Sequence, residues 1–266
     1  MARVSSRWLL WRLPALVAAA AALVFAVGFW LALRGTLGEP IGDPAPLPAA
    51  PKPVARREGE RLLLVIGDSL ARGTGDESGR GFSGDVFEAF RKRGAARMAN
   101  LGINGAESTD VRAVVATPNV RTLAASADAI LLSAGGNDLS HAVARDLRSP
   151  AQAAAALEKG RDAYAANLRA ILKDLREANA TCPIYLIGLY DPFDMQGREG
   201  RLGRSVILGW NGLVAETALG FPGVHVAPTF DMFDGRPDRL ALDRFHPNRK
   251  GYALIAERVV QLLPDN

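Results

Sequence analysis

The chain has 266 residues, of which 48% are hydrophobic and 23% charged, a composition typical of one large folded domain or two small ones. Residues 1–58 contain seven Lys or Arg and three acidic side chains, so their net charge of +4 equals that of the whole chain. Residues 59–266 are therefore neutral, which argues against a basic surface for nucleic acid. The single cysteine, Cys182, excludes an internal disulfide and a multi-cysteine metal site, and we expect it to be a small core residue.

The N-terminal region has the pattern of a membrane anchor. Residues 1–12 contain three arginines and no acid, and residues 13–33 form an uncharged, mostly apolar run. A helix over this run, at about 1.5 Å per residue, would cover roughly the 30 Å hydrocarbon core of a bilayer. The arginines predict that the N-terminus stays in the cytoplasm and that the rest of the chain is extracytoplasmic, either periplasmic or at the cell surface.

A cleaved signal peptide is the alternative to this single-pass signal-anchor, because Ala26-Val27-Gly28 has the small residues of a cleavage site. The apolar run continues through residues 29–31, which favours the uncleaved anchor. Residues 34–60 contain six prolines, which favour an extended polyproline II linker. We expect this linker to hold the folded domain, residues 61–264, away from the membrane.

Short apolar strands alternate with helical patterns from Arg61 onward, which predicts a parallel sheet with helices on both faces. The expected strands are residues 62–66, 97–101, 129–133, 184–188 and 224–227. Ser149 followed by Pro150 predicts the start of a long helix. The apolar stripe that packs this helix is expected to consist of Leu157, Tyr164, Leu168, Ile171, Leu172 and Leu175. Asn248 is expected to cap a last helix that stops at Pro264.

Two glycine-rich connections are long enough to have a function. Residues 71–82 follow the first strand and are expected to rim a pocket. Residues 191–204 contain Arg198, Arg201 and Arg204, and we interpret them either as a solvated loop, which is favoured, or as a mobile lid whose arginines meet an anionic substrate. The glycines of this segment do not form a strand-turn-helix phosphate cradle, so no nucleotide site is expected.

The candidate nucleophile, Ser69, follows the first strand. Residues 62–66 are apolar without alternation, as in a central parallel strand, so Ser69 is expected at the carboxyl edge of the sheet, where α/β proteins bind ligands. Gly67 permits a tight turn there, and Asp68 can hold that turn through hydrogen bonds to the backbone. The tetrapeptide from Gly67 to Leu70 alone is equally compatible with a structural role.

A serine hydroxyl needs a neighbouring imidazole to accept its proton, and the chain has three histidines. His246 is the candidate base because it lies three residues after Asp243, which is able to bond one ring nitrogen while the other faces Ser69. The alternative is that this hexapeptide, DRFHPN, is a helix-capping loop with an incidental histidine. His225 lies within an expected strand and is interpreted as structural, and His141 has a weaker claim to a place in the pocket.

Two glycine-flanked segments follow the second and third strands. Residues 100–105 and 135–138 place backbone N–H groups, and the side-chain amide of Asn137, on the edge that carries Ser69. These are the hydrogen-bond donors that the oxyanion of an acyl-transfer reaction requires. Glycine-rich turns after parallel strands also occur for structural reasons alone, and that interpretation stays open for each segment by itself.

Taken together, four segments resemble in order and spacing the sequence blocks of the GDSL/SGNH hydrolase superfamily, and in particular its single-domain bacterial lipase/esterase-like members. They are Gly67-Asp68-Ser69-Leu70, Gly105, Gly135-Gly136-Asn137-Asp138 and Asp243-Arg244-Phe245-His246-Pro247. The resemblance covers about residues 60–264, with weaker likeness at residues 187–193 and at Trp210-Asn211. It implies a three-layer α/β/α sandwich with a flavodoxin-like, five-stranded parallel sheet, and neither a metal nor a cofactor.

The resemblance also implies a role for each matching residue. Ser69 would be the nucleophile and would lend its backbone N–H to the oxyanion hole, together with Gly105 and the Asn137 amide. His246 would be the general base and Asp243 its orienting acid. Gly102 competes with Gly105 for the glycine of the second block, and counting from the end of the strand favours Gly105.

These observations predict a membrane-anchored serine esterase or lipase that cleaves carboxylic esters through a Ser-His-Asp triad and an acyl-enzyme. The expected substrate is a lipid, an acylated glycan or a small ester. One alternative is an O-acyltransferase or deacetylase acting on cell-envelope glycan or lipid. Another is a tethered binding module without turnover.

Overall fold

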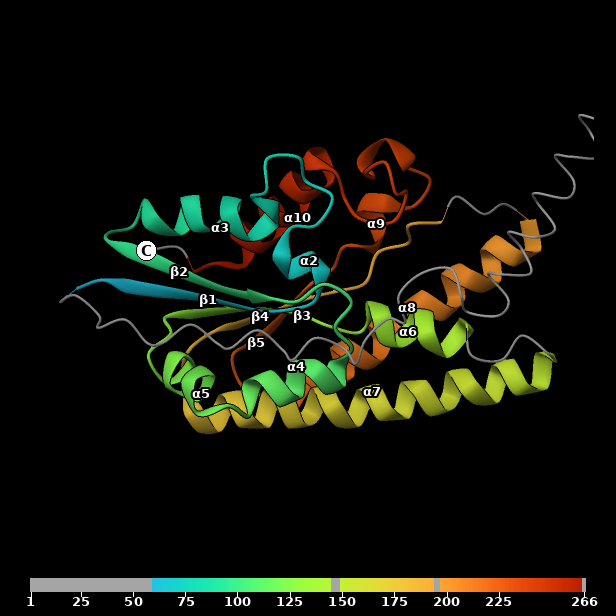
Figure 1. Ribbon diagram of the computed structural model, residues 1–266, viewed down its shortest axis with the longest axis horizontal. Coiled ribbons are helices and arrows are strands. Elements are labelled where there is room, and N and C mark those ends of the chain that lie inside the picture. Colours follow the sequence, from blue (N-terminus) through green and yellow to red (C-terminus); the bar gives the residue numbers. More distant parts are fainter. Residues whose placement is uncertain (1–58, 145–148, 194–196, 265–266) are drawn as a thin grey trace, which may run out of the picture. The chain divides into compact units, whose positions relative to one another are not determined.

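The computed structural model describes residues 59–144, 149–193 and 197–264. Its five strands form one sheet in the order β2-β1-β3-β4-β5, and every pairing is parallel (Figure 1). The strands are β1 (Arg61–Gly67), β2 (Ala96–Gly102), β3 (Ala129–Ser133), β4 (Ile184–Ile187) and β5 (Val224–Ala227). The expected α/β class and all five expected strands are confirmed, with differences of one residue at some ends.

Helices cover both faces of this sheet. They are α2 (Ser69–Arg72), α3 (Gly81–Arg91), α4 (Ser108–Val115), α5 (Pro118–Ala125), α6 (Gly136–Ala144), α7 (Pro150–Ala178), α8 (Gly197–Leu219), α9 (Phe230–Phe233) and α10 (Arg249–Leu262), with a 3-10 turn η1 (Pro237–Arg239). Alternate residues of β1 point to opposite layers: Leu62 belongs to a core cluster with residues of α4, α5, α7 and α8, and Leu63 to a second cluster with residues of α3, α9 and α10. A strand buried on both sides must be apolar at every position, which explains the unbroken run in β1.

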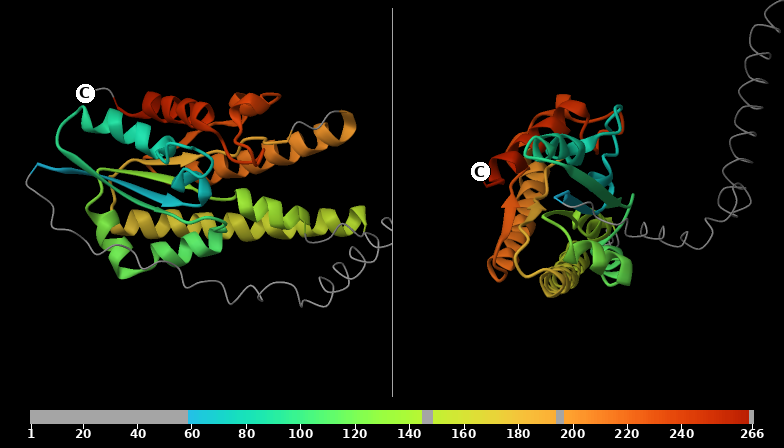
Figure 2. Two further views of the ribbon diagram at one scale, coloured as in Figure 1. Left: turned by 45° about the horizontal axis from the view of Figure 1, so that its top comes forward. Right: turned by 90° about the vertical axis from the view of Figure 1, so that its left-hand side faces the viewer.

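The register of the sheet brings the strand ends to one level. Gly67 pairs with both Gly102 and Ser133, and Ser133 pairs in turn with Ile187. The segments that follow β1, β2, β3 and β4 therefore leave the sheet side by side at its carboxyl edge. Beyond this edge the N-terminal parts of α7 and α8 project past the strands (Figure 2).

The helix caps expected from the sequence are present. The Ser149 hydroxyl accepts a hydrogen bond from the N–H of Gln152, 3.2 Å away, at the start of α7, and Asn248 accepts one from Gly251, 3.0 Å away, at the start of α10. Most of the expected α7 stripe is fully buried; Leu157 is the exception and is discussed below. Cys182 is buried and unpaired, as expected.

The segment interpreted as a solvated loop or a lid at residues 191–204 is largely helical. Its residues 197–204 form the first two turns of α8, so the loop interpretation was wrong for this part. Three glycines lowered the apparent helix propensity, at about 1 kcal/mol each relative to alanine. Packing of the apolar face of α8 outweighs that cost, because Ile207, Trp210 and Val214 are buried.

The expected anchor at residues 13–33 and nearly all of the expected linker at residues 34–60 lie outside the described residues. Residues 59 and 60 form the end of a turn that leads into β1. Among the helices that the structure does describe, none combines the length and the hydrophobicity needed to cross a bilayer.

Candidate active site

Ser69 lies where β1 turns sharply into the short helix α2. Gly67 has a φ of +147°, and a Cβ atom at this position would lie 2.2 Å from the Ser133 carbonyl oxygen, so only glycine fits. Asp68 is the N-cap of α2, and its carboxylate accepts a hydrogen bond from the N–H of Leu70, 3.0 Å away. The turn is thus fixed on both sides of Ser69, and the side chain of Ser69 faces a cavity at the carboxyl edge of the sheet.

Three side chains form a hydrogen-bonded chain at this edge. The Oγ atom of Ser69 lies 2.8 Å from Nε2 of His246, across a sequence separation of 177 residues. The Nδ1 atom of His246 lies 2.6 Å from Oδ2 of Asp243. The structure therefore brings together the three residues that the sequence proposed as nucleophile, base and orienting acid.

The carboxylate of Asp243 is held in its ionised form. Partial burial tends to raise the pKa of Asp243, but hydrogen bonds from the His246 ring and from the N–H groups of Phe245 and His246 outweigh it and lower the pKa below its ordinary value. Both N–H groups donate to Oδ1 at 3.0 Å, which leaves Oδ2 for the imidazole. An ionised carboxylate in this position favours the tautomer with a proton on Nδ1, so Nε2 is free to accept a proton from Ser69.

The loop that carries His246 is braced by residues from elsewhere in the chain. Arg244 adopts a left-handed φ of +53°, which is uncommon for a residue with a side chain. The Tyr190 hydroxyl donates to the Phe245 carbonyl, 2.8 Å away. Gly75 has a φ of +94°, and a Cβ atom there would lie 2.8 Å from Cβ of His246. The segment 71–82, expected to rim a pocket, contributes no residue to the cavity beside Ser69, but Arg72, Gly73, Thr74 and Gly79 line a second, smaller pocket.

Ser133 is a further residue at this site that sequence reasoning missed. Its buried hydroxyl donates to Oδ1 of Asp68 at 2.6 Å and accepts from the N–H of Ala71 at 3.2 Å. Burial raises the pKa of Asp68, and the hydrogen bonds from Ser133 and the backbone offset this only in part. The sequence pattern around Ser133 could have indicated this role, because Ser133 is a polar residue at the end of an otherwise apolar strand, shortly before the Gly-Gly-Asn-Asp segment.

The candidate oxyanion donors differ in their position relative to the cavity. Asn137, in the first turn of α6, lines the cavity, and its Nδ2 donates to the Ala106 carbonyl at 2.8 Å. Gly102 is buried at the end of β2, and its N–H already donates to Oδ1 of Asn100 at 2.9 Å, so it is not a free donor. Gly105 lies in the exposed turn next to Ala106 with a φ of +75°, and is not among the cavity-lining residues.

The other two histidines lie away from Ser69. His225 is on β5 and stacks on Tyr185 with ring centroids 5.5 Å apart, in agreement with a structural role. His141 is exposed on α6, where its ring contacts the carboxylate of Glu107, and it does not line the cavity. Within the described ranges, no group of three or more His, Cys, Asp or Glu residues is arranged to hold a metal ion.

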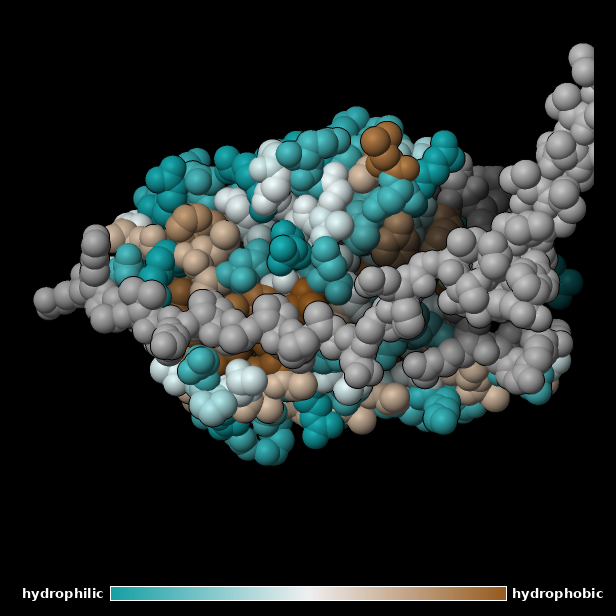
Figure 3. Space-filling model, in the orientation of Figure 1, coloured by the Kyte–Doolittle hydropathy of each residue, from teal (hydrophilic) through white to brown (hydrophobic). Residues whose placement is uncertain are grey.

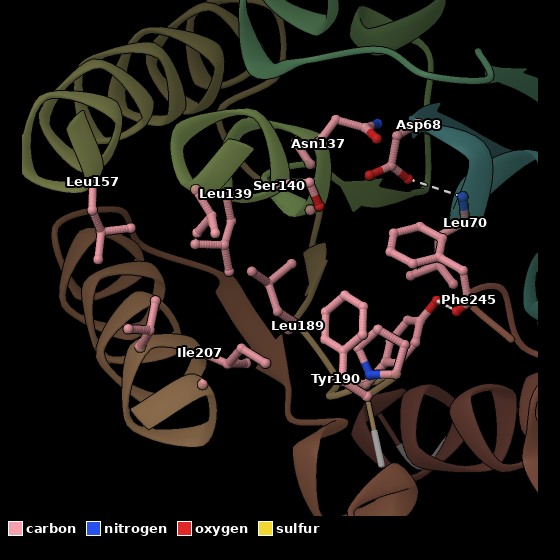
Figure 4. A pocket seen from close by; sticks show the side chains of 18 of the residues that line it. Asp68, Leu70, Asn137, Leu139, Ser140, Leu157, Leu189, Tyr190, Ile207 and Phe245 are labelled. Atoms are coloured by element: carbon pink, nitrogen blue, oxygen red, sulfur yellow. Dashed lines mark hydrogen bonds between the residues drawn. The ribbon is translucent and has the colours of Figure 1, made fainter. Parts of the chain in front are cut away.

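The cavity in front of Ser69 is large and mostly apolar. Its volume is about 930 Å³, and its walls come from α6, the start of α7, the segment after β4, and α8. Figure 4 shows Leu70 and Phe245 at one end of the cavity and Leu157 and Ile207 at the opposite end. On the molecular face seen in Figure 3, hydrophobic residues are set back between the two helical layers on the side of α6 and α8.

The arginines of segment 191–204 do not face this cavity in the described part of the chain. The residues that α8 contributes from this segment are Glu199, Leu202 and Gly203. Arg204 instead pairs with Asp234, with a closest N to O distance of 3.5 Å. The structure gives no support to arginines that meet an anionic substrate.

Comparison with known proteins finds relatives of similar size. The chain is 25% identical over 208 residues to the uncharacterised protein YpmR of Bacillus subtilis, covering 76% of this chain and 81% of YpmR. It is also 25% identical over 206 residues to the spore germination lipase LipC of Bacillus licheniformis, covering 73% of this chain and 92% of that protein.

Solved structures share the fold. A lipase from a goat rumen metagenome superposes with a TM-score of 0.67 at 22% identity, covering 75% of this chain and 95% of the lipase. An acetylxylan esterase from Geobacillus stearothermophilus superposes with a TM-score of 0.59 at 21% identity, covering 76% of this chain and 93% of the esterase. These similarities confirm the expected three-layer α/β/α architecture.

A model of the GDSL-like lipase/acylhydrolase family matches residues 65–254. This range begins within β1 ahead of Ser69 and ends in α10 after His246, so it contains the whole hydrogen-bonded chain at the sheet edge. Since the match covers well over half of the sequence, the chain belongs to the GDSL-like lipase/acylhydrolase family and is a carboxylic ester hydrolase of the GDSL type.

Proposed function

We propose that Ser69, His246 and Asp243 are the catalytic triad of this hydrolase and that the reaction proceeds through an acyl-enzyme. The observation that carries the proposal is the 2.8 Å contact between the Ser69 hydroxyl and the imidazole of His246. Ser69 Oγ attacks the ester carbonyl carbon while Nε2 of His246 takes the hydroxyl proton. His246 then gives this proton to the leaving alcohol, and water, activated in the same way, releases the acid.

Negative charge on the substrate oxygen has to be stabilised during both steps. Asn137 supports this role because its side chain lies in the same cavity as Ser69 and reaches the Ala106 carbonyl with one of its two amide hydrogens. The N–H of Ser69 and the N–H of Gly105 are the other proposed donors. Gly105 does not line the cavity itself, but it precedes Ala106, whose carbonyl accepts the hydrogen bond from Asn137.

An acyltransferase would use the same acyl-enzyme and pass the acyl group to a sugar or lipid hydroxyl instead of water. Partition of the acyl group between water and an added alcohol measures that alternative. A binding module without turnover is disfavoured, because such a protein would not need the short hydrogen bonds that join the three side chains.

The proposal is tested with the Ser69→Ala variant. Wild-type protein is expected to hydrolyse nitrophenyl esters and to be labelled covalently by a fluorophosphonate probe, and the variant is expected to lose both while keeping its melting temperature. Retention of full esterase activity by Ser69→Ala would show that the nucleophile is wrong. A wild-type protein that neither turns over esters nor reacts with the probe would favour the binding module.

We further propose that residues 13–33 anchor the enzyme in a membrane with its catalytic domain outside the cytoplasm. The support is the arginine-flanked apolar run in the sequence. Protease added to intact cells with permeable outer layers is expected to digest the catalytic domain. Full protection of the domain under those conditions, and its digestion only after lysis of the cytoplasmic membrane, would contradict this topology.

A further inference from the structure

The cavity beside Ser69 is much larger than a short acyl group needs. Its volume of about 930 Å³ lies near the upper end of the roughly 300–1,000 Å³ found for small-molecule sites. An acetyl group attached to Ser69 would leave most of the apolar walls in contact with water. We propose, building on the function proposed above, that the acyl group of the natural substrate is a medium or long hydrocarbon chain that fills this cavity.

The direction of the chain follows from the positions of the lining residues. Leu70 and Phe245 flank the Ser69 end, and Leu157 and Ile207 lie at the opposite end, which we call the distal end (Figure 4). Leu189 lies between them (Figure 4). An acyl carbonyl at Ser69 therefore directs its hydrocarbon tail between α6 and α8 toward the distal end, where Leu157 of α7 lines the cavity.

The chemistry of the walls agrees with this occupant. Ser69 and His246, which contact each other, line the cavity together with Asn137 and Ser140, and Glu199 adds one carboxylate from the first turn of α8. Leu157 and Ile207 at the distal end are apolar, and Val206, Ala153 and Ala154 of the same two helices also line the cavity. A hydrocarbon tail needs no hydrogen-bond partners, whereas the hydroxyl groups of a sugar would be left unpaired against such walls.

Three apolar residues that line the cavity are also exposed to solvent. Val143, Phe193 and Leu202 all line the cavity, yet 46%, 49% and 58% of their surfaces, respectively, are exposed. Folded domains rarely leave neighbouring apolar side chains in water without a binding role. A long acyl chain would cover the inner faces of these three residues, and their hydrophobic surface would contribute to its binding.

The first test is the acyl-length profile of the full-length wild-type enzyme. Acetyl, butyryl, octanoyl and dodecanoyl nitrophenyl esters are compared below the concentrations at which they aggregate. Each methylene buried in the transition state raises kcat/KM by up to about fourfold, so the octanoyl ester is expected to exceed the acetyl ester by at least about 10²-fold. A preference for acetyl in a reaction that still requires Ser69 would overturn this inference and leave the proposed triad intact.

The second test narrows the distal end. Leu157→Trp adds volume at the distal end and is expected to lower the ratio of octanoyl to acetyl kcat/KM by at least about tenfold. The reason is that the larger side chain occupies the space that the end of the octanoyl chain would fill. The matched control, Ala155→Trp, puts the same side chain on an exposed position of α7 outside the cavity and should leave the whole profile unchanged. An equal change for all esters with Leu157→Trp would show that the acyl chain does not reach Leu157.

A folding defect in Leu157→Trp is recognised by its melting temperature. In that case Leu157→Ala replaces it, and by enlarging the distal end it is expected to favour dodecanoyl over octanoyl relative to wild type. If Ser69→Ala hydrolyses esters as fast as the wild-type enzyme, the proposed function itself is refuted. That outcome is distinct from a failure of the chain-length inference, in which hydrolysis still requires Ser69.

Discussion

At the Ser69 end of the cavity, the functional groups are held by short hydrogen bonds, whereas at the distal end the walls are apolar side chains from α7 and α8. Hydrogen bonds fix both distance and direction, so the first region holds one arrangement of atoms. Apolar packing has no preferred direction and tolerates changes of volume and shape. The comparison leads us to expect that rate and acyl specificity are separable in this enzyme, since we propose that they rest on different forces in different places.

The largest effect is expected from Asp243, the proposed orienting carboxylate at the Ser69 end. Asp243→Asn keeps the shape of the side chain but favours the wrong tautomer of His246, and we expect kcat to fall by about three to four orders of magnitude. The fall should be the same for acetyl and octanoyl esters. Asp238→Asn is the control, because Asp238 lies in η1 and pairs with Lys250 and Arg236. If the fall in kcat of Asp243→Asn is larger for longer acyl chains, the two regions do not act independently, which would contradict the comparison.

A smaller loss is expected from the proposed oxyanion donor. Asn137→Ala removes an amide that faces the same cavity as Ser69, and kcat should fall by roughly 10²–10³-fold with little change in KM. The amide also donates to the Ala106 carbonyl, so Asn137→Asp serves as a second variant of nearly the same size. Asn137 is only structural if both variants raise KM and leave kcat unchanged.

A milder effect is expected from the brace on the histidine loop. Tyr190→Phe removes the hydroxyl that donates to the Phe245 carbonyl, and a lost hydrogen bond of about 1 kcal/mol corresponds to a loss in kcat/KM of about fivefold to tenfold. Tyr185→Phe is the matched control, because the buried Tyr185 hydroxyl has no partner within the described residues. Equal kinetics in both variants would mean that Tyr190 does not position His246.

The smallest effect concerns stability and pH at the turn before Ser69. Burial raises the folded-state pKa of Asp68 above its ordinary value, so the unfolded chain releases this proton first as pH rises. Ionisation of Asp68 therefore costs stability between the ordinary and the raised pKa. Asp68→Asn removes this cost, and the difference in unfolding free energy, variant minus wild type, should increase from pH 3.5 to pH 7 in urea titrations. A constant difference over this range would contradict the raised pKa.

Short-range patterns in the sequence predicted much of the fold, and they singled out Asp243 and His246, which the structure joins by a hydrogen bond. The unbroken apolar run of β1, the Ser149-Pro150 start of α7 and the Asn248 cap of α10 are local features, and each appears as expected. Asp243 and His246 are three residues apart, so their contact is also local. A strand end, a glycine and an acid also mark the turn of Ser69, but the role of Ser69 as nucleophile was implied only by the resemblance of four segments to a known family.

Other features depend on contacts between distant segments and were decided only by the tertiary structure. Residues 197–204 became helical because the later turns of α8 pack on the core, although their own glycines favour a loop. Ser133 and Tyr190 acquired their positions through hydrogen bonds to segments 65 and 55 residues away. The cavity lies between α6, α7 and α8, so no single stretch of sequence determines its volume. Sequence patterns determine the local conformation of each segment, whereas the packing of these helices determines the shape of the cavity between them.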